Sequence, residues 1–392
     1  MTPSDAHDSS GWRAFSRGFH QRSPLVLAAA ALITLLALVV LQGTLFEGGL
    51  TVVDEGRLLR ITHDDYVHVS IKVQELKKDP PKTRTVYLFG GSGTMECFVS
   101  EASLAAAIAR DAGQPVRVVS LAAHQESMGM TLALVDNLPE GPATLAIGLA
   151  PIRVTGKPSR DATLLSGHEL LVRSKRLEEL APRYFGHAAP STGAIPGIFD
   201  YVGSYLRERA SSEAPWGTRI IYETHYYPWG AKGHTQLGKR RNVLYVLAKD
   251  VTLYRKYGDY NFAMLEEVLK LAGERGFDVV FYDQPLNASA AGPTWNGVVP
   301  AYRKRASELA ERYGVPYVHI ERNVELTDHD FADLFHLLAP ARLKWQPEMA
   351  RQIAATLPPP DGPAAQTGPV AQVPPAALAP PAALASPAAA PR

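Results

Sequence analysis

The chain has 392 residues, of which 46% are hydrophobic and 20% charged, with a formal net charge of +1 and a single cysteine. A chain this long and this apolar can bury a large core, which excludes a wholly disordered or collagen-like protein. The near balance of charge argues against nucleic-acid binding through a basic surface. Cys97 alone can form neither an internal disulfide nor a zinc site built on several thiolates.

The N-terminal part contains a long apolar run. Residues 25–46 (LVLAAAALITLLALVVLQGTLF) carry no charge and, as a helix, could cross a hydrocarbon core of about 30 Å. Arginines precede the run and acidic residues follow it, so the positive-inside rule places residues 1–24 in the cytoplasm and the main domain outside. We therefore predict a single transmembrane helix. A cleaved signal peptide is the alternative, but its apolar core spans only roughly 7 to 15 residues.

Residues 47–357 alternate short β-branched runs with amphipathic stretches. The predicted strands are 85–89, 116–121, 144–149, 278–282 and 316–320, and the predicted helices are 96–112, 127–138, 262–273, 301–313 and 340–355. This α/β alternation, with strands that are apolar throughout, predicts a doubly wound parallel sheet with helices on both faces. Residues 153–260 interrupt the pattern. They are predicted to be an insertion or cap over the carboxyl edge of the sheet, where such sheets bind ligands.

The C-terminal tail has a composition of its own. Residues 358–392 include 11 Pro and 12 Ala and no aromatic side chain. Such a segment cannot bury enough apolar surface to offset the entropy of ordering, so we predict a disordered spacer. A polyproline docking ligand is the alternative, although its spacing arises readily by chance here. We assign the tail no chemistry.

A serine turn is the sharpest local motif. The stretch VYLFGGSGTMECF (86–98) ends an apolar strand in Gly90-Gly91-Ser92-Gly93-Thr94 and then begins a helix. Glycines around the serine permit a tight turn and leave its hydroxyl at the head of a helix, where N–H groups favour negative charge. The alternative is a plain strand-to-helix turn capped by Ser92 or Thr94. A phosphate loop is disfavoured because its Lys-Ser/Thr pair is missing.

A second motif lies just before the final predicted helix. Asp333 and His336 stand three residues apart in DFADLFHL (330–337). At this spacing the carboxylate can hold one imidazole nitrogen while the other nitrogen faces Ser92, the arrangement that activates a serine hydroxyl. A surface pair or a helix cap is the alternative. The placement of the pair after the last predicted strand, and of Ser92 after the first, favours a catalytic triad.

The motifs FGGSGT (89–94) and DFADLFHL (330–337) resemble those of the SGNH (GDSL-type) hydrolase superfamily. More narrowly, they are similar to its membrane-anchored bacterial branch, related to alginate O-acetyltransferases and the D-alanyl transfer protein of teichoic acid synthesis. The resemblance covers roughly residues 84–355 outside the insertion. It implies a flavodoxin-like three-layer fold, with Ser92 as nucleophile, His336 as general base and then acid, and Asp333 orienting His336. We expect no cofactor and no metal.

The oxyanion hole of that family has no clear match. The family's Gly is missing from SLAAHQ (120–125), and its Asn is missing from LAPIR (149–153). Removing one oxyanion donor costs roughly 2.7 to 4 kcal/mol of transition-state stabilisation. A slow or inactive relative is therefore an open alternative. The candidate donors are Ser92, Ala122, Gln125, Arg153 and Asn287.

An aromatic segment in the predicted cap supplies candidate substrate contacts. His225, Tyr226, Tyr227 and Trp229 could stack on sugar faces, and local packing under a long loop is the alternative. Together these features predict a serine-dependent acyltransferase or esterase in the bacterial inner membrane, with a periplasmic domain that moves an acyl group, foremost acetyl, on a cell-envelope or secreted polysaccharide. The resemblance implies an integral membrane acyltransferase as partner.

A non-catalytic reading of the sequence stays open. In it the chain is an SGNH-fold scaffold or glycan-binding subunit of an envelope polysaccharide assembly, which keeps the fold without turnover. A kinase or nucleotide enzyme is disfavoured, because the phosphate-loop lysine is missing and the predicted cytoplasmic part has only 24 residues.

Overall fold

Five strands form one parallel sheet in the computed structural model, which describes residues 23–42, 65–165, 170, 172–186, 225–292 and 297–359. The strands are β1 (Thr85–Phe89), β2 (Arg117–Ser120), β3 (Ala143–Leu149), β4 (Asp278–Asp283) and β5 (Tyr317–Val318). The helices are α2 (Pro24–Gln42), α3 (Asp65–Lys78), α4 (Ser92–Met95), α5 (Glu101–Ala112), α6 (Met128–Asp136), α7 (Pro158–Leu164), α8 (Lys175–Tyr184), α10 (Gln236–Glu274), α11 (Ala288–Ala291), α12 (Val298–Tyr313) and α13 (Ala339–Ala354).

The strand order is β2-β1-β3-β4-β5, and every neighbouring pair is parallel. The prediction of an α/β fold with a parallel sheet is therefore confirmed. β1 has the predicted ends, and the ends of the other strands lie within two residues of those predicted. From β1 the chain moves outward to β2 and then returns past β1 to β3. The loops that follow β1 and β3 thus diverge at the carboxyl edge, where open α/β sheets form their ligand-binding crevice.

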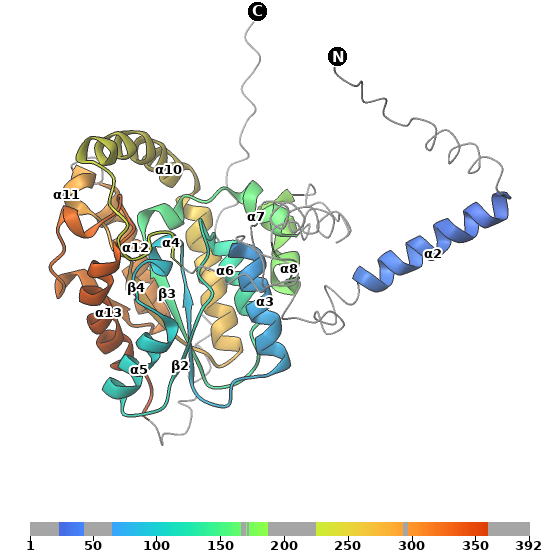
Figure 1. The fold of residues 1–392 in the computed structure, drawn as a ribbon, viewed down its shortest axis with the longest axis horizontal. Helices are drawn as coiled ribbons and strands as arrows, with labels where there is room; N and C mark the ends of the chain where they lie inside the picture. Colours follow the sequence, from blue (N-terminus) through green and yellow to red (C-terminus); the bar gives the residue numbers. More distant parts are fainter. Residues whose placement is uncertain are drawn as a thin grey trace, which may run out of the picture.

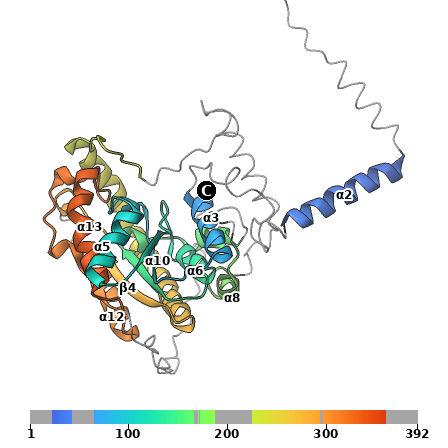
Figure 2. The same cartoon turned by 60° about the horizontal axis from the view of Figure 1, so that its bottom comes forward.

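Helices cover both faces of the sheet (Figures 1 and 2). Successive side chains of β1 point to opposite faces: Tyr87 and Phe89 join one core with α3, α6, α8, α10 and α12, whereas Val86 and Leu88 join another with α5 and α13. Because both faces are buried, all five residues of β1 are buried. This explains why the strands read as unbroken apolar runs in the sequence.

Helix α10 is much longer than predicted. It has 39 residues and begins after Thr235, whose side chain accepts a hydrogen bond from the Gly238 N–H at 3.2 Å. Residue 260, the predicted end of the insertion, falls inside this helix. Gly238 and Gly258 each lower helix propensity by roughly 1 kcal/mol relative to alanine, which masks the first half of the helix in the sequence.

The predicted helix at 96–112 is interrupted near its start. Helix α4 ends at Met95, and α5 begins after Ser100, whose hydroxyl accepts the Ser103 N–H while the Ser103 hydroxyl accepts the Ser100 N–H. This reciprocal cap stabilises the start of α5. The break frees residues 96–99 to contact other segments near the carboxyl edge of the sheet.

The predicted transmembrane run lies partly outside the described residues. Helix α2 covers residues 24–42 of the chain, and residues 43–46 are not among those described. Among the described segments, none of the helices is long and apolar enough to span a membrane. Residues 1–22 and 360–392 also lie outside the described part.

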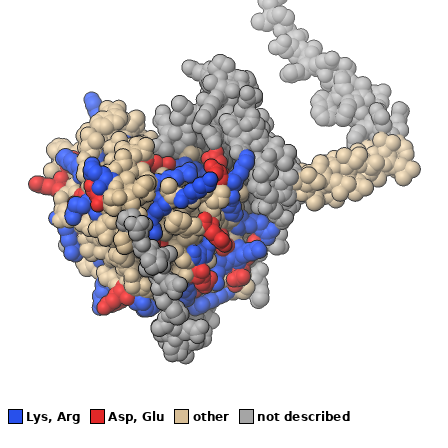
Figure 3. Space-filling model, turned by 90° about the horizontal axis from the view of Figure 1, so that it is seen from below, with Lys and Arg blue, Asp and Glu red and all other residues tan. Residues whose placement is uncertain are grey.

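The described surface carries charges of both signs. On the face shown in Figure 3, Lys and Arg side chains lie interspersed with Asp and Glu. The opposite charges on this face partly neutralise one another, in keeping with the formal net charge of +1.

Candidate active site

Ser92, His336 and Asp333 lie in one hydrogen-bonded chain at the carboxyl edge of the sheet. The Ser92 Oγ and His336 Nε2 atoms are 2.7 Å apart, and His336 Nδ1 lies 2.7 Å from Asp333 Oδ2. Ser92 opens α4 directly after β1, and the Asp333–His336 loop precedes α13. The structure thus brings the three predicted residues together in the geometry of a serine nucleophile, its base and the carboxylate that orients the base.

The surroundings of Asp333 determine which imidazole nitrogen carries the proton. Burial alone would raise the pKa of Asp333, but hydrogen bonds from the His336 side chain and from the N–H groups of Phe335 and His336 hold it below its usual value. The ionised carboxylate accepts the Nδ1–H of His336. The Nε2 atom is then left with its lone pair facing Ser92, so the Ser92 hydroxyl donates to it.

A buried polar network holds the serine turn from below. The Gly90 N–H donates to Glu126 at 3.0 Å, and Arg153 donates to the other oxygen of Glu126 at 2.9 Å and to the Gly148 carbonyl at 2.8 Å. Side-chain exposure is 0% for Glu126 and 1% for Arg153. Burial raises the pKa of Glu126, and the neighbouring Arg153 charge opposes that rise. The turn therefore rests on a satisfied ion pair rather than on apolar side chains.

Close approach of strand ends requires glycine at two further positions. A Cβ atom on Gly148 of β3 would lie 2.6 Å from Thr94 Oγ1 and 2.8 Å from the Tyr282 ring, and one on Gly93 would lie 3.0 Å from Gln284 Oε1. Thr94 in turn hydrogen-bonds with the Tyr282 hydroxyl at 2.9 Å and accepts from Gln284 at 2.8 Å. These contacts lock α4 onto the ends of β3 and β4.

Two of the predicted oxyanion donors are engaged elsewhere. The Arg153 guanidinium is taken up by Glu126, Thr131 and the Gly148 carbonyl. The Asn287 amide donates to Asp328 at 2.8 Å and to the Asp333 carbonyl at 3.2 Å, and its oxygen caps α11. Asn287 therefore supports the loop that carries Asp333, and the side chains of both predicted donors are already engaged in hydrogen bonds.

The other candidates lie in the β1 and β2 turns. The bond from the Ala123 N–H to the Gly90 carbonyl, 3.1 Å long, places the β2 loop beside the serine turn. Within the described ranges, the N–H groups of Ser92 and Ala122 donate to no other atom. Gln125 has the left-handed φ of 51°, and its amide contacts His124 and Arg160. The main chain thus provides the available donors.

The aromatic segment predicted to bind substrate lies against the triad. We call residues 225–230 the aromatic strap. The ring centroids of Tyr226 and Tyr227 lie 6.5 and 5.7 Å from that of His336. Tyr226 is 46% and Trp229 62% exposed. His225 instead turns inward, where it contacts Phe98 edge to face and hydrogen-bonds with the Val99 carbonyl at 3.1 Å, so it is a structural residue.

Several residues at this edge were not predicted. Glu96 and Arg342 form a buried ion pair beneath the strap, and Asp65 accepts hydrogen bonds from the Tyr226 hydroxyl and the His124 N–H. Glu96 lies only four residues past Ser92, yet its partner is 246 residues away. A lone charge in each predicted helix gives no sign of such a pair.

One group of possible metal ligands occurs among the described residues. Asp283, His319 and Glu321 present ligand atoms close together after β4 and β5. Asp283 already accepts from the hydroxyls of Tyr302 and Tyr317 at 2.8 and 2.7 Å, and His319 lies 2.6 Å from its other oxygen. Arg303 bridges Asp283 and Glu321 and brings a positive charge into the group. The cluster is therefore an ion-pair network centred on Asp283.

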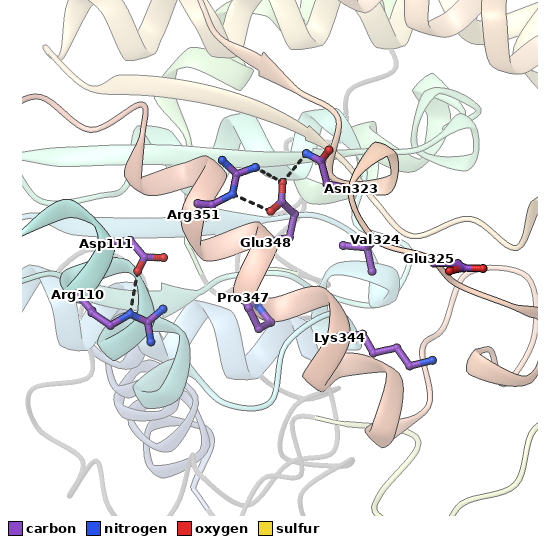
Figure 4. Close-up of a pocket in the computed structure, with 9 residues that line it drawn as sticks. All are labelled: Arg110, Asp111, Asn323, Val324, Glu325, Lys344, Pro347, Glu348 and Arg351. Atoms are coloured by element: carbon purple, nitrogen blue, oxygen red, sulfur yellow. Dashed lines mark hydrogen bonds and ion pairs between the residues drawn. The ribbon is translucent and has the colours of Figure 1, made fainter.

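A pocket of about 570 Å³ lies away from the triad, between α5, α13 and residues 323–325 (Figure 4). Most of its charged side chains are paired: Arg110 with Asp111, Arg351 with Glu348, and Lys344 with Asp330. No residue of the triad or the aromatic strap lines it. This pocket is a solvated hollow bordered by ion pairs.

Comparison with protein-family models and with curated proteins finds no match to this sequence.

Proposed function

We propose that the domain is a serine esterase or acyltransferase of the SGNH type that works through an acyl-enzyme. The observation that carries the proposal is the pair of 2.7 Å contacts that join Ser92 to His336 and His336 to Asp333. An adjacent general base and an orienting carboxylate are what a neutral hydroxyl requires to become a nucleophile. The strand order 2-1-3-4-5, which is that of flavodoxin-like folds, supports the same assignment.

The proposed reaction has two steps. Ser92 Oγ attacks the acyl carbonyl while His336 Nε2 takes the hydroxyl proton, and His336 then gives that proton to the leaving alcohol as the ester bond breaks. Water or a sugar hydroxyl next attacks the serine ester and passes its proton to His336. His336 then gives that proton to Ser92 Oγ as the serine ester bond breaks, which releases the acyl group as an acid or a new ester. Asp333 stays ionised and stabilises the imidazolium in each step.

A main-chain donor serves the oxyanion in this scheme. The Ser92 N–H donates to no other described atom, whereas the Ala122 N–H points away from β1, because the Leu121 and Ala123 N–H groups on either side of it donate to Leu88 and Gly90. The segment after β3 adds no amide side chain, since Ile152 packs into an apolar cluster with Leu334 and Phe335. A site with fewer side-chain donors is expected to turn over slowly.

The proposed substrate is an acyl group, foremost acetyl, on a cell-envelope or secreted polysaccharide. Support comes from the exposed rings of Tyr226 and Trp229 beside the triad, because aromatic rings offer flat apolar surface to sugar faces. An integral membrane acyltransferase as acyl donor is part of the proposal and rests on the resemblance of the serine and histidine motifs alone.

The proposed location is the bacterial inner membrane, with the main domain in the periplasm. Helix α2 exposes large apolar side chains along its length, among them Leu25 (79%), Ile33 (67%) and Val40 (64%). Arginines precede this segment in the sequence, and acidic residues follow it. Apolar surface of this kind is stabilised by lipid, and the charge bias gives the orientation.

The nucleophile assignment is tested with Ser92→Ala. We expect this variant to lose labelling by a serine-directed fluorophosphonate and to lose hydrolysis of p-nitrophenyl acetate, because among the described residues Ser92 has the hydroxyl that contacts His336 Nε2. Ser307→Ala, on the exposed side of α12, is the matched control and should label like the wild type. Undiminished turnover in Ser92→Ala would refute the assignment.

A second function is a glycan-binding subunit that has the fold but no turnover. It is favoured by one observation, the apolar Ile152 environment where the family's Asn donor is expected. Wild-type protein that binds polysaccharide but neither labels nor hydrolyses acetyl esters would support this function over the enzyme.

A further inference from the structure

The buried pair Glu96–Arg342 lies directly beneath the aromatic strap. Glu96 is fully buried, and Arg342 of α13 is 3% exposed. The guanidinium bonds to the Glu96 carboxylate and also donates to the Glu96 carbonyl at 3.2 Å. Burial raises the pKa of Glu96 and lowers that of Arg342, so each charge depends on the other for stabilisation. An ion pair this deep needs several hydrogen bonds to be tolerated.

The remaining hydrogen-bonding capacity of this pair is directed at the main chain of the strap. The Tyr226 N–H donates to Glu96 Oε1 at 2.6 Å, and Arg342 donates to the Tyr227 carbonyl at 2.6 Å. The pair therefore joins the chain just after α4, the strap and α13. These three segments are far apart in the sequence, and two of them carry or adjoin triad residues.

The strap held in this way borders the triad with two rings. The Tyr227 ring tilts by 38° against His336, and the Tyr226 ring meets it edge to face at 72°. The Tyr226 hydroxyl is held in turn by Asp65 at the start of α3. Because Tyr226 is 46% exposed, a ring surface beside the reacting atoms stays open to a ligand.

We propose that Glu96 and Arg342 are positioning residues that hold Tyr226 and Tyr227 as the binding surface for the alcohol part of the ester. This proposal rests on the proposed function. Loss of the first alcohol and attack by the accepting hydroxyl are the same reaction in opposite directions. The two alcohols therefore occupy the same position beside the acyl-enzyme. The strap thus governs which alcohols leave and which accept. The acyl part lies at the serine turn and does not depend on it.

The test uses the double variant Glu96→Leu/Arg342→Met in the full chain. Removing both partners avoids an unpaired buried charge, which a single deletion would leave behind. Two esters with the same acyl group serve as probes, p-nitrophenyl acetate with an aromatic alcohol and ethyl acetate with an alkyl one. We expect KM for p-nitrophenyl acetate to rise about fivefold, because the aromatic alcohol part would lose its contact with a strap ring. We expect kcat for that ester, and KM for ethyl acetate, to stay within about twofold.

A remote ion pair provides the matched control. Arg84 and Asp278 are 2.7 Å apart beside the first residues of β1 and β4, at the opposite edge of the sheet. The variant Arg84→Met/Asp278→Leu should leave both KM values unchanged. If the strap pair instead leaves both KM values unchanged, or if both esters lose turnover together with fluorophosphonate labelling, the positioning role is overturned.

A second variant tests the proposal in case the double variant Glu96→Leu/Arg342→Met does not fold. Arg342→Lys keeps a positive charge beside Glu96 but lacks the planar fork that also donates to the Tyr227 carbonyl, and we expect a smaller rise in KM, about twofold, for the aromatic ester alone. Equal KM values for wild type and Arg342→Lys would overturn the proposal. A wild-type protein that neither labels nor turns over either ester would instead refute the proposed function, which distinguishes the two failures.

Discussion

Asp333, which is partly buried, and Glu126, which is fully buried, are two carboxylates near the serine turn with different neighbours. Asp333 accepts from His336 and from two main-chain N–H groups, which lower its pKa in spite of burial. In Glu126 burial prevails and the pKa rises, although Arg153 opposes the rise. The first carboxylate is thereby suited to orienting an imidazole, and the second to fixing the main chain at Gly90.

Asp250 of α10 provides a test of pH dependence. The residue is 5% exposed, and its Oδ2 atom has no hydrogen-bond partner among the described residues. Burial raises the pKa of Asp250 to about 6, against a partly compensating Lys249 charge. Because the folded-state pKa exceeds the unfolded value, its contribution to stability is fully present below about pH 4 and is lost as the pH rises through 6.

We therefore expect Asp250→Asn to stabilise the protein at pH 7.5, by about 1–3 kcal/mol, and to have little effect at pH 4. Chemical denaturation of both proteins at the two pH values measures the difference. Asp259→Asn is the control, because the Asp259 side chain is 96% exposed and should show neither effect. An equal gain at both pH values would contradict the assigned cause.

Residues of the candidate site could be predicted from the sequence where a short motif contains them. Ser92 stands among glycines after an apolar strand, and Asp333 and His336 are three positions apart, so each could be recognised locally. Glu96 and Arg342 could not, because a buried ion pair across 246 residues resembles two ordinary helix charges in the sequence. The bond between Arg153 and Glu126 was not predicted for the same reason, since the two residues are 27 positions apart.

Among the elements, the serine turn depends on the ends of β3 and β4 as much as on β1. Thr94 is held by Tyr282 and Gln284 at the end of β4, and the backbone of β3 passes close beneath it at Gly148. A side chain at that position would displace Thr94 or Tyr282. The position of the nucleophile is thus coupled to packing within the sheet.

Gly148→Ala tests this coupling. Its Cβ would lie 2.6 Å from Thr94 Oγ1, so we expect a loss of about 1–3 kcal/mol in the free energy of unfolding from overpacking. We also expect slower fluorophosphonate labelling of Ser92. Gly91→Ala is the control for stability, because a Cβ there would meet no atom within 4 Å. Equal stability and labelling in Gly148→Ala would show that the turn does not rest on β3.

Strands could be predicted from the sequence where both faces are buried, because such a strand is an unbroken run of apolar residues. β1 was predicted to the residue because both of its faces are covered. Helix α3 was not predicted, since its β-branched residues alternate as in a strand; only packing of Val69, Val73 and Leu76, spaced by four and three residues, makes the helix favourable. In α10 two glycines concealed a helix that tertiary contacts stabilise.

At the scale of the whole molecule, α2 makes the proposed location testable. We expect the full chain to sediment with membranes and to resist extraction by alkaline carbonate, because its exposed apolar side chains are stabilised by lipid. A chain lacking residues 1–64 should be recovered without detergent and should hydrolyse p-nitrophenyl acetate with unchanged kcat. Recovery of the full chain from the soluble fraction without detergent would contradict the location.

The separation of Ser92 from His336 by 244 residues has a consequence for biosynthesis. The nucleophile follows the first strand, whereas its base and orienting carboxylate come after the last. A nascent or truncated chain that ends before residue 333 therefore lacks the complete triad, however well its serine turn has formed. If the proposed function holds, ester hydrolysis requires a completed chain, because the triad forms only after residues 333–336 have been synthesised and the C-terminal helix has packed.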